Sequence, residues 1–306
     1  MATQVQRSPG LLVLEDGRVF RGNSFGASGS AFGEAVFTTG MSGYQETLTD
    51  PSYQRQIVVM TAPHVGNTGM NDEDEESRRI WVSGFVVRDP SRIASNWRSQ
   101  RTLNDELERH GVVGVSYNDT RALTRHLRDR GAMRAGVFAG ADAEIAVEEL
   151  IAAVQSSPAM AGADLSGEVT TQTAYTIAAE GQRRFRVAAI DLGIKAMTPQ
   201  MMAERGIEVV VMPATTTVEE LGALELDGLF LSNGPGDPAT ADAPVELVRW
   251  ALARKLPVFG ICFGNQILAR ALGYGTYKLR FGHRGINQPV MDLTTGKVEI
   301  TSQNHG

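Results

Sequence analysis

The sequence predicts an α/β protein with a β-rich α+β domain at the amino terminus, followed by a doubly wound domain with a mostly parallel sheet. Its 306 residues are too many for one ordinary domain and suit two. Short apolar runs and glycine-rich turns fill the first part, whereas apolar runs alternate with helical patterns in the last part. We expect the domains at residues 1–140 and 187–306, with a connector at 141–186.

A hairpin is expected near the start of the first domain. The apolar run at 11–14 is followed by Asp16-Gly17 and then by Val19-Phe20. Asp-Gly between two apolar runs is a strong hairpin signal because it favours the tight turns that join antiparallel strands. The same domain should contain strands at 56–60 and 84–87 and helices at 102–110 and 120–130.

The connector is expected to begin with a helix at 143–155 and to continue as a stretch rich in Ala, Gly, Ser and Thr. The second domain should then have strands at 187–190, 207–211, 228–231 and 257–261, and helices at 196–205, 217–224 and 243–254. Short apolar strands separated by helices indicate a parallel sheet. In such a sheet the functional site lies at the carboxyl ends of the strands.

Charge, cysteine content and hydropathy exclude several classes of protein. With 29 basic and 35 acidic side chains the net charge is −6, so nucleic acid and anionic membranes are poor partners. One cysteine cannot form an internal disulfide or a multi-cysteine zinc site, and a lone thiol agrees with the reducing cytoplasm. No apolar run approaches the ~18–20 residues that cross a bilayer, and the first ten residues lack the apolar core of a secretory signal.

The most informative stretch is Gly260-Ile261-Cys262-Phe263-Gly264. It follows an apolar strand, precedes a helical pattern, and has the Gly-x-Cys-x-Gly spacing of a nucleophile elbow with Cys in place of Ser. The glycines permit a sharp turn, and the amino terminus of a helix beneath the sulfur favours the reactive thiolate. A buried, inert cysteine is the alternative, but the flanking glycines favour a nucleophile at Cys262.

A second turn, Ser232–Pro238, follows the expected strand at 228–231 and contains two glycines and two prolines. Its backbone amides could face a developing oxyanion, although an ordinary strand-to-helix loop has the same composition. Gln266 lies four residues after Cys262, so on a helix it shares the same face. It could bind a polar substrate, or it could simply face solvent.

The acidic run Asp72–Glu76 is the one candidate for a metal site. Carboxylates that are adjacent in sequence usually form a solvated face. Histidine or spaced ligands are lacking around the run, so we expect no metal site in this chain.

Three motifs in order resemble class I glutamine amidotransferases: Leu-Ser-Asn-Gly-Pro-Gly-Asp-Pro (231–238), Gly-Ile-Cys-Phe-Gly-Asn-Gln (260–266) and Phe-Gly-His-Arg-Gly (281–285). Four amino-terminal motifs look more specifically like the small subunit of carbamoyl-phosphate synthase: residues 14–22, Thr39–Glu46, Leu48–Tyr53 and Asn71–Ser77. The resemblance covers almost the whole chain and is weak only in the connector. The cysteine motif is shared by many amidotransferases, whereas the amino-terminal motifs are specific to this family.

The resemblance implies that the chain hydrolyses L-glutamine and passes ammonia to a large synthetase subunit. That partner uses ATP with a divalent metal ion, and its product, carbamoyl phosphate, feeds arginine and pyrimidine synthesis; no cofactor is expected in this chain. By the same resemblance Cys262 attacks the glutamine amide, and the amides of Gly234 and Phe263 hold the oxyanion. The residues implied in glutamine binding are Ser52, Gly234, Gly236, Phe263, Gln266, Asn304 and Gly306.

The chain departs from the family pattern in two ways. The usual Gly-Ile-Cys-Leu-Gly-His-Gln has Phe263 and Asn265 here, which removes a titratable neighbour of the thiol. The family's catalytic His and Glu lie beyond the Gln-Asn-His-Gly stretch that ends this sequence at Gly306, so we expect a chain truncated at the carboxyl terminus. A strand is expected at 298–302, just before that end.

None of the other histidines is expected to replace the family base. Packing or capping is expected for His64, solvated helix faces for His110 and His126, and a structural loop for His283. His305 matches a family position outside the catalytic triad.

Two other functions stay open at this point. The missing base favours a catalytically incomplete partner or regulatory subunit, which would bind the large subunit without hydrolysing glutamine. An unrelated cysteine hydrolase on a similar sheet is the third hypothesis.

Overall fold

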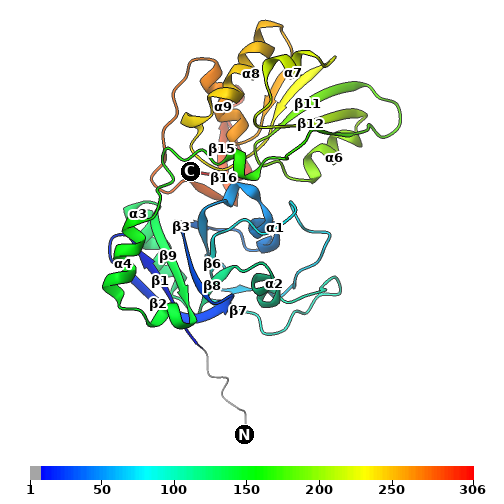
Figure 1. Cartoon of the computed structure of the whole chain (residues 1–306). Coiled ribbons are helices and arrows are strands. Elements are labelled where there is room, and N and C mark those ends of the chain that lie inside the picture. The colour runs from blue at the N-terminus through cyan, green and yellow to red at the C-terminus, as the bar shows by residue number, and fades with distance from the viewer. Residues whose placement is uncertain (1–7) are drawn as a thin grey trace. The chain divides into compact units, whose positions relative to one another are not determined.

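The computed structural model describes residues 8–306, which form two compact units (Figure 1). The first unit comprises the chain up to Thr49, Arg55–Ala159 and Leu279–Gly306; the second comprises Asp50–Gln54 and Met160–Lys278. Both units therefore contain segments that are far apart in the sequence. Within residues 8–306 no helix has the length and apolar character needed to cross a membrane. The expectation about a secretory signal concerns a stretch that lies mostly outside the described residues.

Seven strands of the first unit close into a barrel in the order β1-β2-β8-β6-β4-β3-β9. The strands are β1 Pro9–Leu14, β2 Val19–Gly26, β3 Gly29–Thr38, β4 Gln56–Met60, β6 Gly84–Val86, β8 Val113–Ser116 and β9 Met133–Ala139. Strands β3, β4, β6 and β8 pair in parallel, and the remaining pairs are antiparallel. Because side chains alternate across a strand, Leu12 and Leu14 enter one buried cluster while Leu11 and Val13 enter another.

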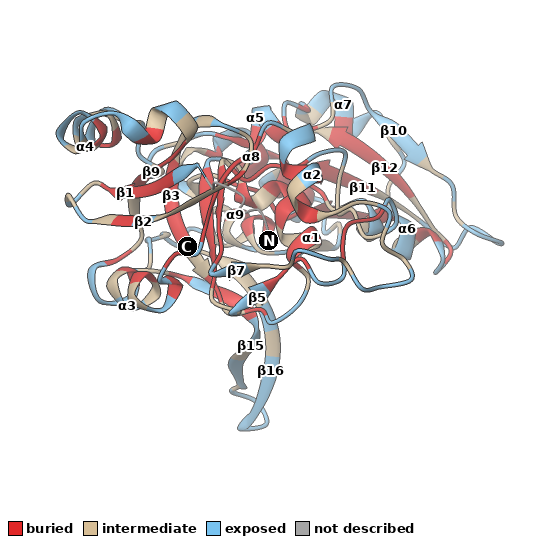
Figure 2. Ribbon diagram, turned by 90° about the horizontal axis from the view of Figure 1, so that it is seen from below, coloured by how far each residue is buried: buried red, intermediate tan, exposed pale blue. Residues whose placement is uncertain are grey.

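Helices and short strands complete the first unit: α1 Tyr44–Thr49, β5 His64–Val65, β7 Asp89–Pro90, α2 Leu103–Arg109, α3 Thr120–Arg130, η2 Gly140–Glu144, α4 Val147–Ser156, and the antiparallel hairpin β15 His283–Asp292 with β16 Lys297–His305. The predicted hairpin, strands and helices of this region are confirmed. Helix α4 begins later than expected because residues 140–144 form a 3₁₀ helix first. Figure 2 shows buried residues concentrated in the barrel strands and exposed ones along the β15–β16 hairpin.

The second unit has a five-stranded sheet in the order β10-β12-β11-β13-β14. Its elements are η1 Pro51–Tyr53, α5 Ser166–Val169, β10 Tyr175–Ile177, β11 Phe185–Asp191, α6 Met197–Ala203, β12 Ile207–Pro213, α7 Val218–Gly222, β13 Gly228–Leu231, η3 Pro238–Thr240, α8 Asp242–Ala253, β14 Val258–Gly260 and α9 Phe263–Ala271. Four strands are parallel and β10 is antiparallel. The prediction of mixed α/β structure is confirmed.

Buried side chains occupy both faces of this sheet. One cluster joins strand residues to α7, α8 and α9 through Leu221, Val248 and Ile267. The other lies on the opposite side, where Phe230 and Val211 pack with Met202 of α6. The expected connector is not structureless, because it includes α5 and β10; β10 is only three residues long, and its pairing with β12 alone distinguishes it from a loop.

The strand order places two loops at the centre of the second unit. From β11 the chain moves to β12 on one side, and it later returns to β13 and β14 on the other side. Such a reversal opens a crevice at the carboxyl ends of the two central strands, where ligands bind in sheets of this kind. The loops that follow β11 and β13 are therefore expected to line a ligand site.

Candidate active site

Cys262 lies at the turn between β14 and α9 in a strained backbone conformation. Its φ is 53° and its ψ is −109°, a region that favours glycine. A non-glycine residue there costs about 1–3 kcal/mol, and such strain persists where the surrounding structure enforces it. Cys262 is partly exposed instead of enclosed in the core, so the arrangement suits a nucleophile better than an inert buried thiol.

The two glycines that flank Cys262 are required by close backbone contacts. A Cβ atom at Gly260 would lie 2.5 Å from the carbonyl carbon and oxygen of Gly264. A Cβ atom at Gly264 would lie 2.3 Å from the carbonyl oxygen of Leu231. The Gly-x-Cys-x-Gly spacing therefore has a steric cause: strand, turn and helix pass too close together for any side chain at either end.

The turn at Ser232–Pro238 lies directly beside this elbow. Leu231 pairs with Gly260 in the parallel register of β13 and β14. Beyond the strands, the Gly264 amide donates to the Ser232 carbonyl at 3.1 Å. These contacts connect the two loops at the same edge of the sheet.

Gly234 and Phe263, the predicted oxyanion donors, occupy these adjacent loops. Phe263 is the first residue of α9, where backbone N–H groups have no partner within the helix and favour an anion. Gly234 packs against the loop after β11, because a Cβ atom there would lie 2.1 Å from the Leu192 carbonyl oxygen. Only glycine fits at this position.

Ser52 belongs to the second unit although most of its sequence neighbours belong to the first. It lies in η1, whose amino terminus is capped by Asp50: the Ser52 amide donates to Asp50 Oδ1 at 2.9 Å. The Asn233 side-chain amide donates to Ser52 Oγ at 3.0 Å. The structure therefore brings Ser52 to the turn that contains Gly234.

Gly236 and Gln266 also lie in these two loops. Gly236 has φ +95°, and a Cβ atom there would lie 2.7 Å from the carbonyl oxygen of Ala163. Gln266 is partly exposed on the first turn of α9, and its backbone N–H donates to the Cys262 backbone carbonyl at 3.1 Å. Asn304 and Gly306, by contrast, belong to the first unit, where Asn304 in β16 pairs with Arg284 in β15. Their part in glutamine binding stays a prediction.

All five histidines lie in the first unit. His126 is not on a solvated face: its side chain is only 11% exposed and contacts Asp16 at 2.7 Å. His64 is half-exposed and paired with Asp89 at 3.2 Å instead of being packed. These two expectations were wrong because a nearby carboxylate, supplied by another segment, decides where each ring lies.

His283 and His305 face each other across the hairpin, with Nδ1 and Nε2 separated by 3.0 Å. His283 is the first residue of β15, so the expected loop position is corrected to a strand end. Burial lowers the pKa of His305, and electrostatic interaction with His283 and Arg284 lowers this pKa further. The neutral ring is therefore favoured at this position.

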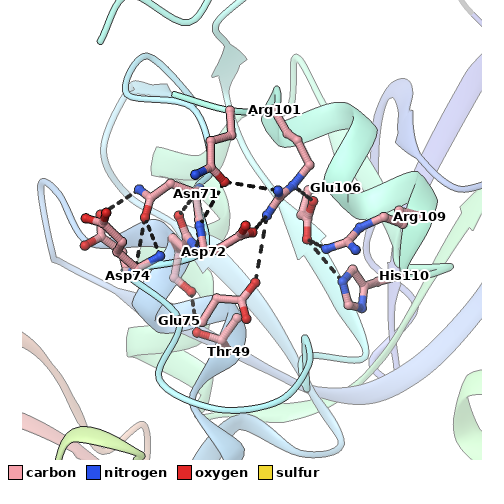
Figure 3. Close-up of polar contacts among 12 residues, drawn as sticks. Thr49, Asn71, Asp72, Asp74, Glu75, Arg101, Glu106, Arg109 and His110 are labelled. Carbon is pink, nitrogen blue, oxygen red and sulfur yellow. Dashed lines mark hydrogen bonds and ion pairs between the residues drawn. The ribbon is translucent and has the colours of Figure 1, made fainter. Parts of the chain in front are cut away.

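The acidic run is paired with arginines in an ion-pair cluster, which here means Asp72, Asp74, Arg98, Arg101, Glu106, Arg109 and His110. Figure 3 shows the part of this cluster around Arg101 and Glu106. Arg101 contacts both Asp72 and the buried Glu106 at 2.6 Å. A hydrogen bond from Asn71 lowers the pKa of Asp74 against the effect of burial, with help from Arg98. The run is therefore an ion-paired segment, and only part of it, as at Asp72, is solvated.

Over residues 8–306, no three His, Cys, Asp or Glu side chains are grouped so that they could hold a metal ion.

Sequence reasoning missed Asn233 and Asp50 as partners of Ser52. The one signal was their place in the motifs at 231–238 and 48–53, where only neighbouring residues were assigned a role.

Two protein families match the chain, one in its amino-terminal part and one in its carboxyl-terminal part. Residues 12–137 match the family described as "Carbamoyl-phosphate synthase small chain, CPSase domain". Residues 188–306 match "Glutamine amidotransferase class-I". A solved aminopeptidase from Aneurinibacillus sp. strain AM-1 is 11% identical and covers 88% of this chain and 70% of its own, but with a TM-score of 0.25 this likeness bears on no conclusion.

Curated relatives are similar over nearly the whole chain. The carbamoyl phosphate synthase small chain of Streptomyces coelicolor is 67% identical over 98% of this chain and 79% of the relative. The small chain of Mycobacterium tuberculosis is 62% identical over 98% of this chain and 81% of the relative. The small chain of Corynebacterium diphtheriae is 58% identical over 99% of this chain and 81% of the relative. The chain therefore belongs to the carbamoyl-phosphate synthase small-chain family.

Proposed function

We propose that this chain is the glutamine-hydrolysing subunit of carbamoyl-phosphate synthase. The Cys262 thiol gives up its proton and attacks the side-chain amide carbon of glutamine as the thiolate; the carbon–nitrogen bond then breaks as the amide nitrogen takes up that proton and leaves as ammonia. Water then hydrolyses the thioester to glutamate and regenerates the thiol. The observation that supports this most strongly is the strained, partly exposed Cys262 beside a glycine turn in the same unit.

The amides of Gly234 and Phe263 are proposed to hold the oxyanion of the tetrahedral intermediate. Support comes from their places in the two loops that the Gly264-to-Ser232 hydrogen bond joins. A preorganised donor of this kind typically contributes about 10²–10³-fold to the rate. Glutamine itself would be held by Ser52, Gly236, Gln266, Asn304 and Gly306, together with the two oxyanion donors.

A large synthetase subunit is the proposed partner. Free ammonia is mostly protonated at neutral pH, and ammonium is not a nucleophile, so transfer within a complex protects the reactive form from water. The large subunit would use ATP with a divalent metal ion to join ammonia to bicarbonate and phosphate. The product would feed arginine and pyrimidine synthesis in the cytoplasm, where a lone reactive thiol stays reduced.

Substitution of the nucleophile tests this function. The full gene product is assembled with the large subunit, and carbamoyl phosphate formation is measured with glutamine and, separately, with ammonium chloride. In Cys262→Ser we expect the glutamine-dependent rate to fall at least about 10³-fold, with the ammonia-dependent rate retained. Mass spectrometry of the parent protein after a glutamine pulse should detect the thioester at Cys262.

Glutamine-dependent synthesis that survives in Cys262→Ser would refute the assigned nucleophile. A parent complex that binds the large subunit but releases no ammonia from glutamine would instead indicate a partner without glutaminase activity.

A further inference from the structure

We infer that Asn233 is a positioning residue for glutamine hydrolysis, because its side-chain amide holds Ser52 and the backbone beside Gly234 in one arrangement. The inference rests on the proposed function and extends it to a residue that contacts neither the thiol nor the oxyanion in that mechanism. Asn233 lies between Ser232, the first residue after β13, and Gly234.

The Asn233 side chain lies among acceptors from two other segments. Its Nδ2 atom is 2.8 Å from the Gly193 carbonyl oxygen, 3.0 Å from Ser52 Oγ and 3.4 Å from Asp50 Oδ1. Carbonyl and carboxylate oxygens only accept hydrogen bonds, so the group that faces them must be the donating NH₂ and not the amide oxygen. Asn233 is 8% exposed, and water therefore offers few substitute partners.

The charges around this amide are fixed by a second contact. Asp50 is itself buried, and its Oδ2 atom is 3.3 Å from Lys195 Nζ. Asp50 and, through it, Lys195 are the charged groups that these contacts link to the Asn233 side chain. The Asn233 amide therefore sits against a paired carboxylate and adds no charge of its own.

The turn at Gly234 is held against the loop after β11 by backbone contacts as well as by the bond from the Asn233 side chain to the Gly193 carbonyl. Ser232 Oγ donates to the Asn233 carbonyl at 2.7 Å and accepts from the Leu192 amide at 2.9 Å. An ideal Cβ atom at Gly193 would lie 3.2 Å from Gly234 Cα, so the loops after β11 and β13 are in close contact. Loss of the amide donor would loosen Ser52 and this loop contact together.

Two kinds of substitution separate positioning from general support of the fold. Asn233→Ala removes the donors. Asn233→Asp keeps the size but directs a carboxylate at the Gly193 carbonyl and at Asp50; a neighbouring like charge raises the pKa of such a group. Once protonated, the acid can donate one hydrogen bond again. The Asn233→Asp variant should therefore recover activity as the pH falls, and Asn233→Ala should not.

The experiment measures glutamine hydrolysis by the full gene product with the large subunit between pH 6 and pH 9 (about the range in which a raised carboxyl pKa and the thiolate both matter). We expect Ser52→Ala to raise KM for glutamine about tenfold with little change in kcat, and Asn233→Ala to raise KM similarly while lowering kcat about tenfold. The double variant should show no further rise in KM, because both changes remove the same contact. Gln200→Glu, an amide-to-acid change on the exposed side of α6, is the matched control and should behave as the parent.

Several outcomes would overturn the inference. They are an unchanged KM and kcat in Asn233→Ala, independent effects of Ser52→Ala and Asn233→Ala on KM, or a pH profile of Asn233→Asp that parallels that of Asn233→Ala. If Asn233→Ala does not fold, the pH profile of Asn233→Asp is compared with that of the parent, and two parallel profiles overturn the inference. A parent complex without Cys262-dependent hydrolysis would refute the proposed function itself, which is a different result from normal parent activity with unaffected Asn233 variants.

Discussion

The elbow around Cys262 and the ion-pair cluster around Glu106 both collect polar groups, but they do so in opposite ways. At the elbow, a strained backbone is enforced by neighbours that leave no room for a side chain at Gly260 or Gly264. In the cluster, carboxylates and guanidinium groups satisfy one another, and Glu106 is 1% exposed with partners on both oxygens.

The difference teaches how to distinguish a functional group of residues from a structural one. The charges of the cluster already pair with one another, so the cluster stabilises the fold without binding a ligand. The elbow stores strain at a partly exposed cysteine, and this strain costs stability. At the elbow, strain at a partly exposed cysteine beside a glycine turn points to chemistry, whereas mutual neutralisation in the cluster points to stability.

The largest effect is expected at Gly264. Gly264→Ala would place a Cβ atom 2.3 Å from the Leu231 carbonyl oxygen, and backbone cannot move aside as a flexible side chain can. We expect a loss of about 3 kcal/mol or more in the free energy of unfolding, measured by urea denaturation. Gly167→Ala is the control, since nothing lies within 4 Å of its Cβ position. Equal stability of the two variants would contradict the steric account of the motif.

The next largest effect concerns the cluster. Glu106→Gln keeps the shape but removes the buried carboxylate from Arg101 and Arg109, although Arg101 keeps its contact with Asp72, and we expect a loss of about 2–3 kcal/mol in the free energy of unfolding. Hydrogen exchange of the α2 amides should report this loss. Asp105→Asn, on the same helix and exposed, is the matched control; an equal loss there would refute a special role for Glu106.

The contacts of Glu106 with Arg101 and Arg109 also make the stability of α2 depend on pH. Burial raises the pKa of Glu106, but hydrogen bonds from Arg109 and Arg101 outweigh burial and place it below the usual value. A lowered carboxyl pKa contributes stability above the unfolded pKa of about 4.3, and this contribution is lost as the pH falls through the folded pKa. Protection of α2 should therefore decline below about pH 4 in the parent and change less in Glu106→Gln.

A smaller effect of opposite sign is expected at Cys262 itself. Cys262→Gly relieves the strain of φ 53°, so we expect the free energy of unfolding to rise by about 1 kcal/mol while glutamine hydrolysis is lost. Urea denaturation checks the stability, with Cys262→Ala as the control that keeps a Cβ atom. A Cys262→Gly variant no more stable than Cys262→Ala would show that the conformation is not strained.

The smallest effect is a change in titration with no change in fold. Hydrogen bonds from the hydroxyls of Thr294 and Thr295 lower the pKa of Asp292 to about 2 at the exposed turn of the β15–β16 hairpin. Thr294→Ala should move this pKa toward the usual value, as followed by NMR titration of the carboxyl group. An unchanged pKa would indicate that the turn, unlike the cluster, does not hold its carboxylate through side-chain donors.

Most individual elements were predictable because their signals are local. Helix α3 occupies the predicted range and is capped by Asp119, and β4 and β13 coincide with short apolar runs. The short strand β10 was not predictable, because three residues contain no periodicity and only pairing with β12 defines them. The start of α4 was misplaced because residues 140–144 have helical composition but form a 3₁₀ turn.

For the candidate site, the sequence by itself determined the Gly-x-Cys-x-Gly elbow and the glycine turn, because both depend on backbone conformations that only consecutive residues of these types adopt. Only the tertiary structure decided that Ser52 lies within the second unit, that Asn233 donates to it, and that Glu106 is surrounded by cations. Those contacts join segments that are distant in sequence. They arise from the packing of strands and loops, which no local pattern records.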